Sequence, residues 1–152
     1  MITDYMTKKL ITVKESDSLI DLMDFMVTHR LSGIPVTDET GKLLGFAPNT
    51  ALLDAILPDY LKNLPTSLGS IVGKDMEEYL HNKKDNLKAM TVKDIMVEPS
   101  YILNTNSSFI EAVKVFVEKE INRIAVVDDN KILVGILCRN NVLTAMQKAL
   151  SD

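Results

Sequence analysis

Residues 33–45 read GIPVTDETGKLLG, and residues 123–135 read RIAVVDDNKILVG. In each stretch an apolar run comes first, a polar turn that begins with Asp follows, and a second apolar run ends in Gly. Apolar, largely β-branched runs on both sides of a short polar turn predict two strands joined as a hairpin. Because the two stretches lie 90 positions apart and align without a gap, they indicate two copies of one structural unit.

The same offset extends the match in both directions. Before the hairpin, DYM (4–6) aligns with DIM (94–96), and after it Leu53 aligns with Leu143. Chance alignment of apolar segments accounts for part of this match, but it does not easily keep two Asp and one Gly in register. We therefore expect one copy at residues 1–57 and another at 92–152, separated by an insertion at 58–91.

A helix is predicted on each side of the hairpin in both copies. Ser18 and Ser108 are N-cap candidates, and Asp21 and Glu111 stand three residues later in capping-box positions. Apolar residues follow at helical spacing over 19–30 and 109–120, so one face of each helix is expected to be buried. Closing helices are predicted over 50–57 and 140–150. Each copy is thus expected to be a β-α-β-β-α unit of a mixed α/β (α+β) fold.

The insertion differs between its two halves. Pro58, Pro65, Gly69 and Gly73 interrupt the first half. The second half, DMEEYLHNKKDNLKAM (75–90), is predicted to be a helix packed on the core. Its charged residues are expected to face solvent, and a surface that docks a partner is the alternative.

The composition of this 152-residue chain argues against several classes of function. A net charge of −4, few aromatic residues and no Trp give no basic face or stacking platform for nucleic acid. No apolar run approaches the roughly 20 residues of a membrane span, and MITDYMTKKL lacks the apolar core of a signal peptide. The single Cys allows no disulfide within the chain, so a reducing, cytoplasmic location is expected.

The order of these motifs resembles the CBS domain, a small nucleotide-sensing module named for cystathionine β-synthase, present as a tandem pair (a Bateman module). The resemblance rests on DYM and DIM, on the two hairpins, and on CRNNVL (138–143) after the second Gly. It implies two units packed through their sheets about a pseudo-two-fold axis, and pairs that associate into homodimers. The insertion and the RNNVL ending resemble free-standing bacterial and plastid CBS pairs.

In this family the second strand is followed by Gly, two apolar residues, Thr or Ser, two further residues and Asp. The Asp binds the ribose of an adenosine ligand, and the Thr or Ser and its neighbours hold phosphate. The start of a helix suits this task, because its free N–H groups and partial positive charge attract phosphate. The resemblance therefore implies a ligand site where the second strand of a copy passes into its closing helix.

The second copy carries an altered form of this pattern, GILCRNN (135–141). Asn141 replaces the Asp, and its amide is expected to accept a hydrogen bond from one ribose hydroxyl. Cys138 replaces the Thr or Ser. The guanidinium group of Arg139 can donate charge-assisted hydrogen bonds to phosphate, and such bonds contribute about 1.5–3 kcal/mol. The expected ligand-binding residues are Ile102, Asn104, Arg123, Ile124, Cys138, Arg139, Asn140 and Asn141.

Ordinary structural roles remain open for all of these residues. A solvated helix start is the alternative for residues 139–141, and a surface salt bridge explains Arg123 equally well. Simple strand packing is the alternative for Ile102, Asn104 and Ile124, which the resemblance places against the adenine.

The first copy departs further from the family pattern, with GFAPNTA at 45–51. Ala51 has no group for ribose, and Pro48 has neither a hydroxyl nor a backbone N–H. We expect this site to be degenerate, with its pocket closed by Phe46. Thr50 is then interpreted as the N-cap of the helix that follows.

Together these observations favour a non-catalytic regulatory, energy-sensing module that binds AMP, ADP or ATP, mainly at the second copy. The alternatives are a structural module for protein–protein interaction whose sites have decayed, and a binder of S-adenosylmethionine. No enzyme is expected, because the sequence shows no nucleophile–base arrangement, metal cluster or P-loop, and no cofactor is required. An unidentified effector protein and a second copy of the chain are the expected partners, with no nucleic acid or membrane.

Overall fold

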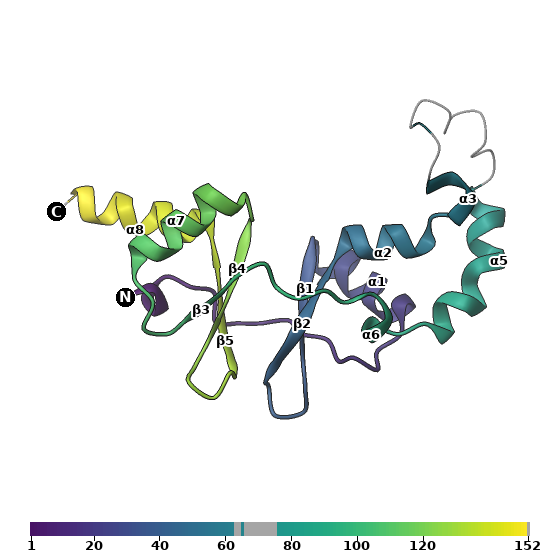
Figure 1. Ribbon diagram of the computed structural model, residues 1–152, viewed down its shortest axis with the longest axis horizontal. Helices are drawn as coiled ribbons and strands as arrows, with labels where there is room; N and C mark the ends of the chain where they lie inside the picture. Colours follow the sequence, from purple (N-terminus) through teal and green to yellow (C-terminus); the bar gives the residue numbers. More distant parts are fainter. Residues whose placement is uncertain (63–64, 66–75, 152) are drawn as a thin grey trace. The chain divides into compact units, whose positions relative to one another are not determined.

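The computed structural model describes residues 1–62, 65 and 76–151. Helices and strands follow one another along the chain (Figure 1), which confirms a mixed α/β fold. The first copy contains η1 (Ile2–Asp4), α1 (Leu19–His29), β1 (Gly33–Thr37), β2 (Leu43–Pro48) and α2 (Asn49–Ile56). The insertion contains α3 (Asp59–Lys62) and α5 (Met76–Ala89). The second copy contains α6 (Val92–Ile95), β3 (Ile102–Asn104), α7 (Phe109–Lys119), β4 (Arg123–Val127), β5 (Leu133–Cys138) and α8 (Arg139–Ser151).

The helices that precede the hairpins begin at the predicted caps. The hydroxyl oxygen of Ser18 accepts a hydrogen bond from the N–H of Asp21, and that of Ser108 accepts one from Glu111, each at 3.1 Å. Both helices also end alike, at left-handed residues that occupy the same repeat position, Arg30 and Glu120. The local structure therefore repeats together with the sequence.

Three features of the first copy and the insertion differ from expectation. In the first copy no strand precedes α1 among the described residues, so β1 and β2 form a two-stranded sheet. The prediction that Thr50 caps α2 was wrong, because α2 begins one residue earlier and Pro48 stands at its N-cap without a side-chain hydrogen bond. The short helix α3 was not predicted. Of the four helix-breaking residues in the insertion, Gly69 and Gly73 lie outside the described residues.

The second copy forms a three-stranded sheet in the order β3-β4-β5. β3 runs parallel to β4, and β4 runs antiparallel to β5. One face of this sheet packs against α7 and α8, and this core contains Leu103, Ala112, Val115, Phe116, Ile124, Val126, Leu137 and Val142. The opposite face carries the alternate residues of the same strands.

The repeated Asp residues organise the hairpin turns. Asp38 Oδ1 accepts hydrogen bonds from the N–H groups of Thr40 and Lys42, at 2.9 and 3.0 Å. Asp128 Oδ1 accepts the matching bonds from Asn130 and Ile132 at the same distances. The Thr40 hydroxyl also donates to Asp38, and this bond is the main cause that lowers the pKa of Asp38. A short acceptor side chain is thus needed at both turns.

The chain divides into two compact units that do not follow the order of the copies. The first, which we call the C-terminal unit, contains Met1–Thr12, Pro35–Phe46 and Glu98–Asp152. Within it the tips of the two hairpins pair with each other. The Leu43 N–H donates to the carbonyl oxygen of Lys131 at 3.1 Å, and the Leu133 N–H donates to that of Gly41 at 3.0 Å.

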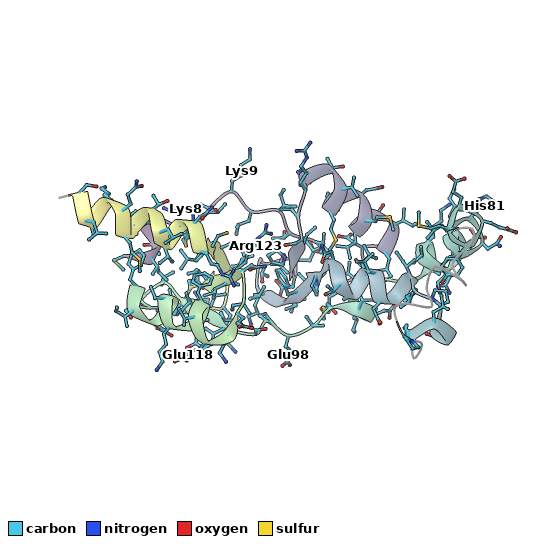
Figure 2. All side chains as sticks on the ribbon, turned by 90° about the horizontal axis from the view of Figure 1, so that it is seen from above. Lys8, Lys9, His81, Glu98, Glu118 and Arg123 are labelled. Atoms are coloured by element: carbon cyan, nitrogen blue, oxygen red, sulfur yellow. The ribbon has the colours of Figure 1, made fainter. Side chains whose placement is uncertain are left out.

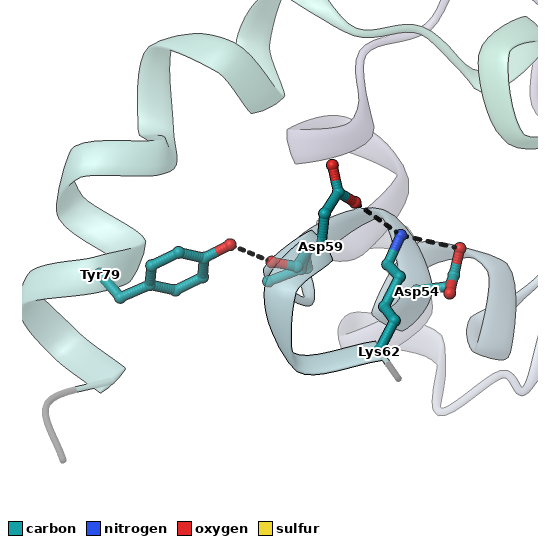
Figure 3. A network of polar contacts seen from close by, with 5 residues as sticks. Asp54, Asp59, Lys62 and Tyr79 are labelled. Carbon is teal, nitrogen blue, oxygen red and sulfur yellow. Dashed lines mark hydrogen bonds and ion pairs between the residues drawn. The ribbon is translucent and has the colours of Figure 1, made fainter. Parts of the chain in front are cut away.

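The second unit, which we call the central unit, contains Val13–Ile34 and Ala47–Val97. In it α1 packs against α2 and α5, and α2 packs against α6. The Tyr79 hydroxyl of α5 donates to the carbonyl oxygen of Ile56 at the end of α2 (Figure 3). Beside it Lys62 Nζ lies 3.1 Å from Asp59 and 3.5 Å from Asp54, and the bond to Asp59 is the main cause that raises the pKa of Lys62. The predicted helix of the insertion is therefore anchored to the first copy.

Candidate functional site

In the second copy a strand passes directly into a helix. β5 ends at Cys138 and α8 begins at Arg139, with no residue between them. The amide oxygen of Asn141 accepts a hydrogen bond from the Cys138 N–H at 2.7 Å. Arg139 and Asn140 have exposed side chains in the first turn. Backbone N–H groups in the first turn of a helix lack partners within the helix, so this end of α8 favours an anion.

The sheet register determines which expected residues share a face. Arg123 is the direct cross-strand partner of Cys138, and Ile102 is the partner of Ala125. Paired residues in neighbouring strands point to the same face, and successive residues along a strand point to opposite faces. Because Leu103, Ile124 and Leu137 belong to the helix-covered core, Ile102, Arg123 and Cys138 lie on the other face.

Six of the eight expected residues therefore lie at one end of this sheet. Arg123 lies at the N-terminal end of α8 (Figure 2), beside its cross-strand partner Cys138. Ile102 is the cross-strand partner of Ala125, which follows Arg123 by two positions in β4. Ile102 is 43% exposed, and Arg123 and Cys138 are half-buried. We call this group the β5–α8 site; it consists of Ile102, Arg123, Cys138, Arg139, Asn140 and Asn141.

The other two expected residues have structural roles that account for them. Ile124 is fully buried in the helix-covered core, so its side chain serves strand packing. Asn104 pairs with Val127, four residues along β4 from Arg123, which is a separation of about 13 Å at ~3.3 Å per residue. Its side chain donates to Asp129 at 3.2 Å and accepts from the Asn106 N–H at 3.0 Å. We leave both residues out of the β5–α8 site.

The bond from Cys138 also fixes how Asn141 faces a ligand. Because an N–H requires an acceptor, the amide oxygen must point towards Cys138, and the NH₂ group occupies the other position. The oxygen keeps one further lone pair. A ribose hydroxyl that donates to Asn141 would therefore share this oxygen with the helix cap.

The corresponding junction of the first copy lacks both partners of this bond. Pro48 has no N–H to donate, and Ala51 has no side-chain acceptor. The N–H of Asn49, the first residue of α2, donates instead to the carbonyl oxygen of Ser32 at 2.7 Å. The two substitutions are consistent with each other, because an acceptor at position 51 would find no donor at position 48.

Sequence reasoning missed one contact beside this site. The N–H of Thr7 donates to the carbonyl oxygen of Ile136 at 2.8 Å, and the Ile136 N–H donates back to Thr7 at 3.0 Å. Ile136 lies two residues before Cys138. No local pattern signals this pairing, because Thr7 belongs to the first copy by sequence.

Two further kinds of site were sought in the part of the chain that the structure describes. No cluster of three or more His, Cys, Asp or Glu residues there could hold a metal ion. None of the described helices is both long enough and apolar enough to cross a membrane.

Comparison with known proteins gives matches over most of the chain. The sequence profile of the CBS domain matches twice, at residues 2–58 and 92–148. The uncharacterized protein MJ1426 of Methanocaldococcus jannaschii is 30% identical over 96% of this chain and 90% of its own length. The chloroplastic CBS domain-containing protein CBSX1 of Arabidopsis thaliana is 28% identical over 93% of this chain, which spans 62% of that protein. A crystal structure of CBSX2 of Arabidopsis thaliana in complex with AMP has a TM-score of 0.71 and 25% identity, covering 97% of this chain and 96% of that one.

Proposed function

We propose that this chain, which belongs to the CBS domain family and carries two copies of the domain, is a non-catalytic regulatory module that binds an adenine nucleotide. The ligand site in this proposal is the β5–α8 site of the second copy. The observation that carries the proposal is the arrangement of Arg123, Cys138 and Arg139 around the start of a helix that directly follows a strand.

The chemistry of this site suits a phosphate group. The N–H groups of the first turn of α8, which have no partner within the helix, and the guanidinium group of Arg139 are all hydrogen-bond donors. Charge-assisted bonds from Arg to phosphate are shorter and about twice as strong as neutral ones. The AMP complex of CBSX2 supports the proposal, because that protein has the same fold.

The proposed binding is one-sided. The first copy has Asn49 where the second has Arg139, and Ala51 where the second has Asn141. At these two positions it therefore has no charged group for phosphate and no polar side chain for ribose. We expect one nucleotide per chain, bound at the second copy.

The charge of the site favours a nucleotide over S-adenosylmethionine, which is the second adenosine ligand considered. The sulfonium group of S-adenosylmethionine is a cation, and a cation near Arg123 and Arg139 is repelled rather than attracted. Phosphate in the same position gains from both residues. AMP, ADP and ATP are thus the proposed ligands.

A thermal-shift series tests this function. A ligand at a hundredfold excess over its Kd stabilises the folded state by about 2.7 kcal/mol, which for this length raises Tm by roughly 5–11 °C. AMP or ADP should give such a shift, and adenosine and S-adenosylmethionine smaller ones at equal concentration. If no adenine nucleotide changes Tm even at millimolar concentration, the structural module with decayed sites replaces this proposal.

Self-association and a cytoplasmic location complete the proposal. Apolar residues stay exposed at matching repeat positions, with Val27 and Val117 each 73% exposed, Leu53 64% and Leu143 60%. Exposed apolar surface of this kind is typical of a protein–protein interface. A second copy of the chain and a separate effector protein are the partners that we propose for it.

A further inference from the structure

The core of the second copy contains a residue from the start of the chain. Ile2 is fully buried, and it belongs to a cluster whose other buried members, among them Leu103, Phe116 and Leu137, all come from the second copy. The ring of Tyr5 meets that of Phe109 edge-on, with centroids 5.6 Å apart. Figure 1 shows the N-terminal segment beside α7 and α8 of the same unit. The first residues of the chain are thus part of the fold that carries the β5–α8 site.

The same segment also holds the outer edge of β5. Thr7 and Ile136 exchange two backbone hydrogen bonds, at 2.8 and 3.0 Å, on the side of β5 that β4 leaves open. One residue away, Met6 fills the space above Gly135, where an added Cβ would overlap the Met6 side chain. The segment therefore contacts β5 at Gly135 and Ile136, and Ile2 belongs to the same core cluster as Leu137, the residue before Cys138.

The repeat provides an equivalent position in the other unit. Val92 aligns with Ile2 at the offset of 90 residues, and it is also fully buried. It lies in α6, which packs against α2 in the central unit. Ile2 and Val92 are thus buried at the same repeat position, but only Ile2 packs in the unit with the β5–α8 site.

We propose that Met1–Thr7 is a positioning segment for the β5–α8 site, although it lies in the other copy by sequence. Ile2, Met6 and Thr7 act through Gly135, Ile136 and Leu137, and they fix where β5 ends and α8 begins. The consequence for ligand binding rests on the proposed function. The consequence for the junction itself does not, and the two are measured separately.

The first experiment measures AMP binding by calorimetry at a temperature where every variant is folded. Ile2→Ala should raise Kd about fivefold, because only about one fifth of the molecules then have the binding-competent junction. Val92→Ala removes a core side chain at the matching position and should leave Kd unchanged. Thr7→Pro, at an exposed residue, removes one bond to Ile136 and should act in the same direction as Ile2→Ala. Ile2→Val should restore the Kd of the unmodified chain.

The second experiment needs no ligand. Hydrogen exchange at the N–H groups of Ile136 and Cys138 should be about tenfold faster in Ile2→Ala, because local opening of the junction becomes easier. In Val92→Ala these two groups should exchange at the rate of the unmodified chain. Equal exchange in the two variants overturns the positioning role, whatever AMP does. If the exchange rates differ as expected but the unmodified chain does not bind AMP, the proposed function fails and only the structural role of the segment stands.

Discussion

The hydrogen bond between Cys138 and Asn141 closes the first turn of α8, and it shows why single residues in a repeat change together. Asp38 and Asp128, by contrast, are kept in both copies, and each accepts hydrogen bonds from two N–H groups of a hairpin turn. Asp4 and Asp94 likewise stand at the third position of a short helical turn, where Asp94 accepts the Thr91 N–H at 2.9 Å. The polar residues kept in both copies, the two Asp pairs and the cap pair Ser18 and Ser108, thus hold backbone turns and helix starts, and they do not identify the ligand.

The cap leads to a prediction about stability that does not depend on any ligand. Asn141→Ala should lower the free energy of unfolding by about 0.5–1.5 kcal/mol, because the Cys138 N–H loses its acceptor. Ala51→Asn, at the matching position, should give no gain, since Pro48 has no N–H to donate. Urea denaturation measures both changes. A stabilising Ala51→Asn, or an Asn141→Ala variant as stable as the unmodified chain, would contradict the assignment of this bond.

At the scale of helices and strands, the sequence predicted the bounds of α1, α2, α5, α7 and α8 to within one residue, and it predicted the two hairpins that β1 and β2, and β4 and β5, form. These elements are defined by local signals, namely helix caps, the spacing of apolar residues along the chain, and turn residues. Whether a strand residue faces a ligand or the core depends on register, which is set by other segments. The register that brings Ile102 closer than Asn104 to Arg123 could therefore not be predicted from the sequence.

The insertion helix provides a prediction at this scale. Tyr79→Phe removes the hydroxyl that binds the Ile56 carbonyl oxygen, and it should cost about 0.5–1.5 kcal/mol of unfolding free energy. His81→Ala, at an exposed residue of the same helix, is the control and should change stability by no more than ~0.5 kcal/mol. Thermal or urea unfolding of the three proteins is the measurement. A neutral Tyr79→Phe variant would mean that α5 is not anchored to α2 through this bond.

At the scale of the whole chain, compact units and sequence copies do not coincide. The leading turn of the first copy packs in the C-terminal unit, and that of the second copy packs in the central unit. The sequence around Ile2 and Val92 does not indicate in which unit each residue packs, because burial in either unit requires an apolar residue. The repeat therefore predicted the two copies, and the structure was needed to show which segments pack together.

Self-association follows from the exposed apolar residues of both copies. Sedimentation at tens of micromolar should show a dimer, since apolar side chains such as Val117 and Leu143 are expected to be covered by a second copy. Val117→Glu should shift the protein towards the monomer, because a charge would then be buried. Glu118→Gln, at the next residue, is the control. A monomer at these concentrations would rule out the proposed homodimer.

The central claim, a single nucleotide site at the second copy, is tested most directly by calorimetric titration with AMP. We expect one AMP per chain, bound through the start of α8. Arg139→Ala should weaken binding by about tenfold or more, the equivalent of a charge-assisted hydrogen bond of at least ~1.4 kcal/mol. Asn49→Ala, the same position in the first copy, should leave Kd unchanged. Two equivalent sites per chain, no binding at millimolar AMP, or an equal loss in the two variants would contradict the account.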